Sequence, residues 1–181
     1  MYKHCTTEES ARRQRQLEQC LLELMGERLL HQITVGDICD LASVSRKSFY
    51  RYFDNKEDCL DALLDHAIMD GATYCLPDSD SSDPTLDFCS RLFEYWQNQT
   101  LLLDALERNG QSLKILQRMV RYILVEEPDY ARYMNISSQD LMEHVVYTVG
   151  GIMGLILTWH HERYPKSAAQ MGEVLYRLIR R

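Results

Sequence analysis

Features that mark sheets, secreted scaffolds and zinc modules are scarce in this sequence. Its 181 residues include only 8 glycines and 4 prolines, and no segment shows the apolar and polar alternation of a half-buried strand. The six cysteines lie at least fourteen residues apart, so none forms the Cys-x-x-Cys pair of a zinc module. The N-terminal stretch lacks the apolar core of a signal peptide. These absences predict a cytoplasmic chain with free thiols.

The sequence also contains none of the motifs that would indicate an enzyme or a metal site. No nucleophile and base pair, metal-ligand spacing or phosphate loop is present, so we expect a protein that is not an enzyme. The run from His160 to Glu162 contains metal-binding residue types, but adjacent helical residues diverge by about 100 degrees. We therefore predict no metal site and no cofactor.

One acidic loop, LPDSDSSDPT over residues 76–85, invites a calcium interpretation. Counted from Asp78, however, Asp83 stands where a calcium loop needs glycine, and Cys89 stands where it needs glutamate. Asp83 is better explained as the cap of a helix that begins at Pro84.

Charge is distributed unevenly along the chain. The net charge of −7 argues against a protein that coats nucleic acid indiscriminately. Between Arg46 and Lys56, by contrast, four basic residues accompany one acid, Asp54, which leaves a local charge of +3. A second basic cluster, the three arginines within residues 12–15, lies near the start. This pattern predicts a small electrostatic footprint on DNA.

The segment from Ile33 to Leu64 contains the start signals of three helices. Thr34 and Asp37 have the spacing of a capping box, and Ser45 is a suitable N-cap for the next helix. We expect Asp54 and Glu57, with Asn55, to cap the third helix. Phe49 and Phe53 lie four residues apart, so they point to the same side and should be buried against the first of these helices. The side chains left facing outward are Ser45, Arg46, Lys47, Ser48, Tyr50 and Arg51. Basic and hydroxyl groups at the start of a short helix suit a reader of the DNA major groove.

The stretch ITVGDICDLASVSRKSFYRYFDNKEDCL resembles the DNA-binding segment of the TetR family of bacterial transcriptional regulators. The family's hallmark is an aromatic-Tyr-x-aromatic-Phe run followed within three residues by Lys-Glu. The resemblance implies a recognition helix over residues 45–52, phosphate contacts by Tyr50 and Lys56, and backbone contacts at Thr34 and Val35. The residues that we predict to contact DNA are Thr34, Val35, Ser45, Arg46, Lys47, Ser48, Tyr50, Arg51 and Lys56.

Two residues depart from the family pattern. Ser43 stands in the turn where the family usually has glycine, so a residue with a Cβ must adopt the conformation that glycine supplies. Gly36 stands where relatives often have a longer polar residue, which removes one potential backbone contact.

The periodicity beyond this segment predicts an all-α chain of about nine helices. We assign residues 1–55 to an N-terminal three-helix helix-turn-helix DNA-binding domain. Residues 56–181 form a C-terminal helical domain for ligand binding, regulation and dimerisation. Helical spacing continues from Lys56 to about Tyr74, long enough for a lever between the two domains.

Apolar residues cover nearly all sides of a helix predicted from Ser138 to about Arg163. A membrane span is the rival interpretation, but the apolar part, Val145–Trp159, is only fifteen residues long and contains glycines, so we predict no membrane association. Contact with a second copy of the chain explains the helix better, as the TetR resemblance also implies. The predicted homodimer interface residues are Gly150, Gly154, Trp159, Leu175 and Leu178.

Aromatic residues in the second half provide candidates for a ligand pocket, although ordinary core packing explains each of them as well. They are Tyr74, Phe88, Tyr95, Trp96, Met119, Tyr122 and Tyr147. The sequence and the resemblance together predict a repressor that binds an inverted-repeat operator in double-stranded DNA as a dimer. A small-molecule inducer of unknown class would release it. The alternative is a TetR-like regulator without a small ligand, controlled by a protein partner through its C-terminal half.

Overall fold

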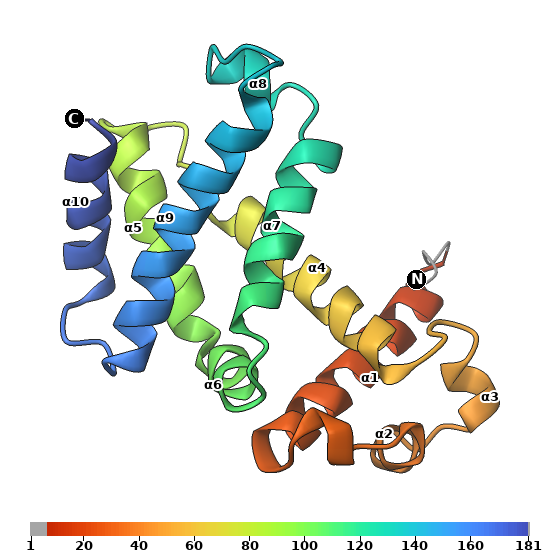
Figure 1. Ribbon diagram of the computed structural model, residues 1–181. Coiled ribbons are helices and arrows are strands. Elements are labelled where there is room, and N and C mark those ends of the chain that lie inside the picture. Colours follow the sequence, from red (N-terminus) through yellow and green to blue (C-terminus); the bar gives the residue numbers. More distant parts are fainter. Residues whose placement is uncertain (1–6, 181) are drawn as a thin grey trace.

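The computed structural model describes residues 7–180, apart from the side chain of Tyr133 (Figure 1). Over that range the chain forms ten α-helices and one short 3₁₀ helix, and contains no strand. The all-α prediction is confirmed. The first part comprises α1 (Glu8–Glu27), η1 (Leu30–Gln32), α2 (Val35–Leu41), α3 (Arg46–Phe49) and α4 (Lys56–Tyr74). The second part comprises α5 (Pro84–Asn98), α6 (Thr100–Arg108), α7 (Ser112–Glu126), α8 (Tyr130–Tyr133), α9 (Leu141–His161) and α10 (Ala168–Ile179).

Side-chain caps set the starts of the first helices. The Thr34 hydroxyl accepts from the Asp37 N–H at 3.1 Å, and the Asp37 carboxylate accepts from the Thr34 N–H at 2.7 Å. Ser45 caps α3 in the predicted way. Of the residues predicted to cap α4, Asn55 occupies the N-cap position and accepts from the Asp58 N–H at 2.7 Å, so the predicted capping box of Asp54 and Glu57 is wrong. An N-cap must directly precede the first helical residue, which is Lys56.

The turn between α2 and α3 contains the strained residue that the sequence predicted. Ser43 has a φ of 53°. Left-handed backbone is costly for a residue with a Cβ. Two neighbouring contacts hold the turn in this geometry. Ala42 is buried, and the Val44 N–H donates to the Cys39 carbonyl at 2.9 Å.

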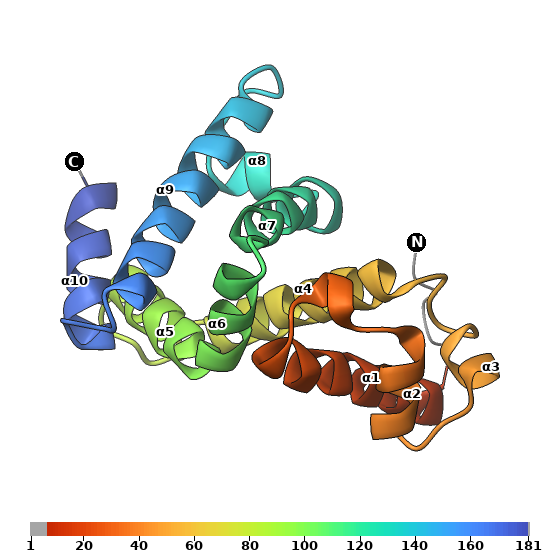
Figure 2. The same ribbon diagram turned by 60° about the horizontal axis from the view of Figure 1, so that its bottom comes forward.

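α4 connects the two parts of the molecule (Figure 2). It packs against α1 on one side and against α5 and α7 further along. Leu60 and Leu64 are fully buried. At the α7 contact, Arg118 bonds to Asp65, and Lys114 lies 2.7 Å from Asp61. The lever prediction therefore has a physical basis, since this helix contacts helices of both parts.

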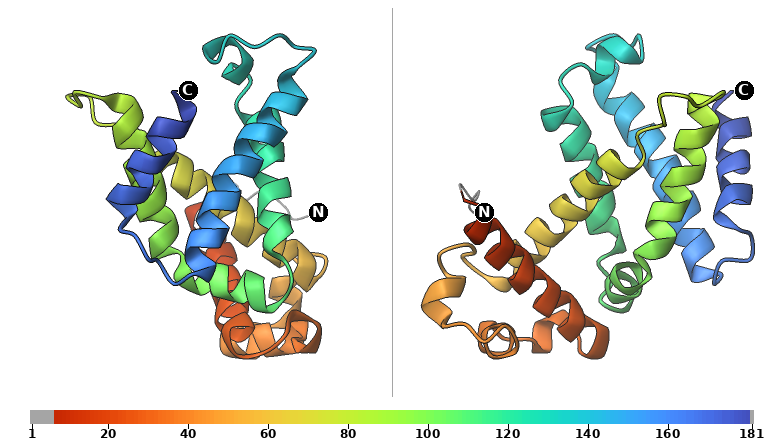
Figure 3. Two further views of the ribbon diagram at one scale, coloured as in Figure 1. Left: turned by 60° about the vertical axis from the view of Figure 1, so that its left-hand side comes forward. Right: turned by 180° about the vertical axis from the view of Figure 1, so that it is seen from behind.

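The second part is built on two helix pairs, α5 with α10 and α7 with α9 (Figures 1 and 3). At the first pair Gly172 is required, because a Cβ there would lie 2.7 Å from the Cα of Ser90. Both views place α10 on the opposite side of the molecule from α2 and α3.

α9 buries one face within the chain and leaves another open. Val149, Met153 and Ile156 are buried, whereas Val146 and Tyr147 are 46% and 82% exposed. Within the single chain, therefore, only one of the two apolar faces of α9 is covered. Among the described helices, α9 also has the length and apolar composition of a membrane span, a test that core helices of soluble proteins pass as well.

Candidate nucleic-acid interface

Two fully buried aromatic rings hold α3 in place. Phe49 and Phe53 are 0% exposed, and their ring centroids lie 5.3 Å apart. Because both rings point into the core, neighbouring side chains on α3 must point away from it. Ser45, Arg46, Lys47, Tyr50 and Arg51 are exposed, and Ser48 is half-buried. These six residues are called the reading surface below.

The α3 helix is shorter than predicted. It ends at Phe49, and residues 50–52 form a turn instead of the further helical residues expected up to Tyr52. Tyr52 is buried, at 7% exposure, while Tyr50 is 49% exposed and packs edge-on against Phe49, with the centroids 5.6 Å apart. Tyr50 therefore presents its hydroxyl group to the solvent side while its ring is positioned by the core.

Gly36 provides space for Arg46 to lie across the start of α2. A Cβ at Gly36 would lie 2.8 Å from the Arg46 Nη2 atom. The missing side chain, which the sequence suggested would remove a DNA contact, thus permits a close approach between α2 and the reading surface. Thr34 and Val35 lie at the same helix start, exposed and half-buried respectively.

Lys56 already has two backbone partners. Its Nζ donates to the carbonyl oxygens of Leu30 and Ile33, each at 2.7 Å. These bonds tie the first turn of α4 to η1, and they explain a lysine at a helix start, where the helix dipole disfavours a cation. An ammonium group has three donors, so one remains for a phosphate oxygen.

The basic cluster in α1 is divided by the fold. Arg15 forms a bidentate pair with Asp70 of α4, at 2.9 and 3.0 Å. Arg13 donates to the Gln16 side chain at 3.0 Å. Arg15 therefore serves the α1–α4 contact, and Arg12 and Arg13 are the arginines left at the exposed helix start.

The seven predicted pocket residues do not gather around one cavity. Tyr95 and Trp96 are core residues at 7% and 1% exposure, and the Tyr95 hydroxyl donates to the Ala67 carbonyl at 2.5 Å. Tyr74 and Phe88 are 43% and 40% exposed, and Tyr147 faces solvent on α9. Met119 and Tyr122 are half-buried on α7, where Tyr122 borders an open hollow of about 140 Å³ between α4 and α7.

The predicted dimer residues also separate into two groups. Trp159 and Leu175 are 2% and 4% exposed, because they pack inside the chain, Trp159 against Phe93. Gly154 is exposed, Gly150 is half-buried, and Leu178 is 50% exposed. Only this second group is accessible to a partner. A Cβ added at Gly150, Gly151 or Gly154 would meet no atom within 4 Å.

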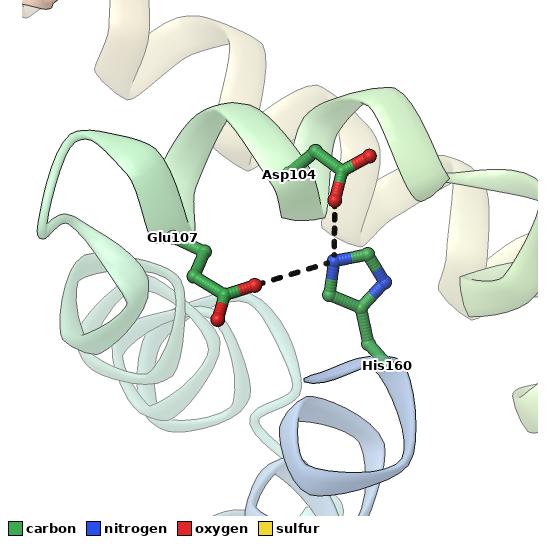
Figure 4. Close-up of side chains that lie close together, drawn as sticks. All are labelled: Asp104, Glu107 and His160. Carbon is green, nitrogen blue, oxygen red and sulfur yellow. Dashed lines mark ion pairs between the residues drawn. The ribbon is translucent and has the colours of Figure 1, made fainter. Parts of the chain in front are cut away.

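One cluster of acidic residues and a histidine was not predicted from the sequence. Asp104 and Glu107 of α6 lie beside His160 of α9 (Figure 4). The spacing of three residues places the two carboxylates on one face of α6. Their histidine partner lies on a different helix, and only the packing of α9 against α6 brings the three side chains together.

Comparison with known proteins agrees with this geometry. Residues 21–63 match the family model described as bacterial regulatory proteins, tetR family. Over 126 residues the chain is 27% identical to the dhaKLM operon transcriptional activator DhaS of Lactococcus lactis subsp. lactis (strain IL1403). That match covers 69% of this chain and 56% of the relative, so the chain spans little more than half the length of that protein.

Solved structures share the whole fold. A putative TetR-family regulator from Syntrophomonas wolfei str. Goettingen aligns with a TM-score of 0.63 at 18% identity, covering 91% of each chain. The fatty acid degradation regulator FadR from Bacillus halodurans aligns with a TM-score of 0.57 at 16% identity, over 92% of this chain and 93% of that one. The helix-turn-helix unit of this chain is that of the TetR family, within the all-helical fold of TetR-family transcriptional regulators.

Proposed function

We propose that the protein is a dimeric transcriptional regulator that reads an inverted-repeat operator through the reading surface of α3. The observation that carries this proposal is the pairing of a rigid aromatic support with an exposed basic surface. Phe49 and Phe53 are fully buried, and Arg46, Lys47 and Arg51 are exposed beside them. Arg and Lys can donate to guanine O6 and N7, and side-chain hydroxyls can contact base edges or phosphates.

The distribution of charge restricts the DNA contact to the region around α3. The chain as a whole carries a net charge of −7, so DNA is repelled by most of its surface. Arg51, Lys47 and Arg46 provide attraction where α3 can enter the major groove. The two phosphate contacts that the family resemblance implies are Tyr50, within the reading surface, and Lys56, at the start of α4, and they would set its register on the DNA.

The dimer that we propose uses the outer face of α9, defined as Met142, Val146, Tyr147, Gly150, Gly151 and Gly154. Met142, Val146 and Tyr147 expose 52%, 46% and 82% of their surface. The glycines on the same face leave room for a second helix to approach. A two-fold axis through this face would bury the exposed apolar residues of both copies at once. Two reading surfaces related by that axis require an operator with inverted half-sites.

Control by a small-molecule inducer remains the first hypothesis, with the α4–α7 hollow as its location. Asp65, Arg118 and Arg121 border that hollow, which lies against the lever helix. A ligand there would compete for the Arg118–Asp65 contact and shift α4, which changes the spacing of the two reading surfaces.

Control by a protein partner is the second candidate. The dispersal of the seven predicted pocket residues favours it, since core-buried Trp96 and solvent-exposed Tyr147 cannot line one ligand site. The Lactococcus lactis relative is described as an operon activator, which makes activation as plausible a mode as repression for this chain.

The test is selection of binding sites from random duplex DNA with the purified full chain, followed by sequencing. We expect enrichment of an inverted repeat with half-sites about one helical turn apart or more. The Lys47→Ala variant should enrich a degenerate version of the same repeat. Recovery of no enriched sequence from folded dimeric protein would contradict the proposal.

A further inference from the structure

The cluster of Asp104, Glu107 and His160 combines a buried histidine with one half-buried and one exposed carboxylate. His160 is 1% exposed, and its Nε2 atom faces both carboxylates (Figure 4). The distances are 3.1 Å to Asp104 Oδ1 and 3.7 Å to Glu107 Oε2. Even so, this nitrogen forms no hydrogen bond with any group in residues 7–180. A buried nitrogen that faces two carboxylates without forming a hydrogen bond to either of them calls for an explanation.

A chain of hydrogen bonds shows that Nδ1 of the imidazole ring carries a hydrogen. The Thr100 hydroxyl donates to the Gln97 carbonyl at 2.6 Å, because a carbonyl oxygen can only accept. The Tyr164 hydroxyl, 2.9 Å from Thr100 Oγ1, must then donate to it. His160 Nδ1, 2.6 Å from the Tyr164 oxygen, must in turn donate its N–H to Tyr164.

This order leaves the Nε2 atom of a neutral His160 with a lone pair directed at two carboxylates. Asp104 Oδ1 also accepts a hydrogen bond from the Arg163 guanidinium at 2.8 Å. A lone pair and two carboxylates repel one another unless a positive charge lies between them. That charge is either a proton on Nε2 or a metal ion.

The spacing of the three atoms suits a metal ion. Four ligands about 2.0 Å from a tetrahedral ion lie roughly 3.3 Å from one another. The two distances from His160 Nε2, 3.1 and 3.7 Å, bracket that value. The hydrogen bond from Nδ1–H to Tyr164 matches the usual arrangement in which a ligating histidine donates its other N–H to a supporting group.

We propose that His160, Asp104 and Glu107 form a binding site for a divalent transition-metal cation of the Zn²⁺ type, which links α9 to α6. An imidazole nitrogen with two carboxylates favours such an ion over Mg²⁺ or Ca²⁺, which prefer oxygen ligands. His161 lies at the same place, with Nδ1 2.5 Å from the other oxygen of Glu107. It or a water molecule would complete the coordination.

A cation can reach this site from solvent. An open hollow of about 280 Å³ is bordered by Glu107, His160 and His161, so hydrated ions can approach the ligands. Arg163 competes for the site, because its guanidinium donates to Asp104 Oδ1 at 2.8 Å. The Arg163 side chain is 68% exposed and can turn to the second oxygen of Asp104 or to solvent.

The proposed site lies between α9 and a helix that contacts the DNA-binding unit. α6 also packs against α1, and Asn109 at its end accepts from the Leu30 N–H beside the DNA-binding unit. A cation that holds α9 to α6 therefore connects the predicted dimer helix to the helix-turn-helix unit. The site itself does not depend on DNA binding or on the proposed dimer.

Calorimetric titration of the metal-free full chain with Zn²⁺ tests the proposal. We expect one Zn²⁺ per chain, and affinity at least about 100-fold weaker in Asp104→Asn, Glu107→Gln and His160→Gln. Tyr164→Phe removes only the supporting hydroxyl and should cost roughly 10- to 100-fold. The matched control is His31→Gln, because His31 is an exposed histidine that does not belong to the cluster, and the affinity of this variant should equal that of the original chain.

Two results would overturn the proposal, in which the main competitors for Zn²⁺ are the cysteine side chains. One is equal Zn²⁺ affinity in the original chain and in the three ligand variants, which would assign binding to other residues. The other is an absence of Zn²⁺ binding, which would leave a protonated His160 paired with Asp104. Should His160→Gln fail to fold, the absorption spectrum of Co²⁺ bound to the original chain decides. Visible bands without a sulfur charge-transfer band support this site, and a sulfur band contradicts it.

Discussion

The reading surface on α3 and the outer face of α9 lie over similar apolar cores but expose opposite chemistry. Phe49 supports exposed Arg46 and Lys47, whereas buried Met153 and Val149 support exposed Val146 and Tyr147. Charged groups at the first surface suit a phosphate polymer, and apolar groups at the second suit a protein surface. The comparison shows that the core determines where each helix lies, while the residues left outside determine what it can bind.

The largest effect is expected from removing the support of the reading surface. Phe49→Ala leaves a cavity in a fully buried site and should lower the free energy of unfolding by about 3–5 kcal/mol. Operator binding should be lost with it. Chemical denaturation measures the change, and Tyr50→Ala, at a half-exposed ring beside it, is the matched control with a much smaller loss. Equal losses in the two variants would mean that α3 is not held by its buried ring.

The second largest effect is expected on the α9 side. Gly154→Arg places a charge on the outer face, and the protomer itself should tolerate it because a Cβ there meets nothing within 4 Å. Arginine is also a better helix former than glycine, so folding should not suffer. Sedimentation velocity should show a monomer, and Gly154→Ala should leave the dimer largely intact. A Gly154→Arg dimer would place the interface elsewhere.

Single contacts on the reading surface should give intermediate effects. Lys47→Ala and Arg46→Ala should each cost about 1–3 kcal/mol of operator binding and relax the base preference at one position of each half-site. Lys166→Ala, in the exposed turn before α10, is a control of equal charge change and should bind normally. A loss that is uniform over all DNA sequences would make these residues positioning contacts instead.

Lys56 separates a structural role from a phosphate contact. Lys56→Ala removes two bonds to backbone carbonyls, so the melting temperature should fall, and the salt dependence of DNA binding should also decrease by about one unit of slope. Binding measured over a series of salt concentrations reports the slope. A lower melting temperature with an unchanged slope would leave Lys56 with the structural role alone.

The smallest effect concerns the cap of α2. Thr34→Ala removes the hydroxyl of the capping box and should lower the melting temperature by about 2–4 °C at neutral pH. Hydrogen bonds from Thr34 lower the pKa of Asp37 below its ordinary value of 3.8. That contribution is present above pH 3.8 and is lost as the pH falls through the lowered pKa. The difference in melting temperature between the two proteins should therefore become smaller in acid, leaving the part due to the Asp37 N–H bond to the hydroxyl, and a constant difference would contradict this account.

Much of the helical architecture could be predicted from local signals. The box at Thr34, the cap at Ser45 and the proline after Asp83 act within a few residues, and α4 extends from Lys56 to Tyr74 as its spacing indicated. The wrong capping box at Asp54 and Glu57 has the same local character, since neighbouring polar residues, Asn55 among them, can compete for one cap position. Ser43 could be recognised as strained because the turn around it was identifiable from the sequence.

The contacts between helices could not be obtained in this way. The sequence indicated only a phosphate as the partner of Lys56, whereas the fold also places the carbonyl oxygens of Leu30 and Ile33 beside it. The aromatic residues of the second half looked equivalent, yet Trp96 is buried and Tyr147 is exposed. A helical pattern shows that a residue lies on an apolar face, but which neighbour covers that face depends on the whole fold.

The sequence by itself determined the helices, their caps and the basic surface of α3, because backbone hydrogen bonds, capping groups and side-chain periodicity act over one or two turns. Tertiary structure alone decided that α9 is open on one side, that Arg15 is paired with Asp70, and that His160 faces Asp104 and Glu107. These features depend on contacts between residues far apart in the chain. Such contacts are set by how all the helices share one core, and no local pattern specifies that arrangement.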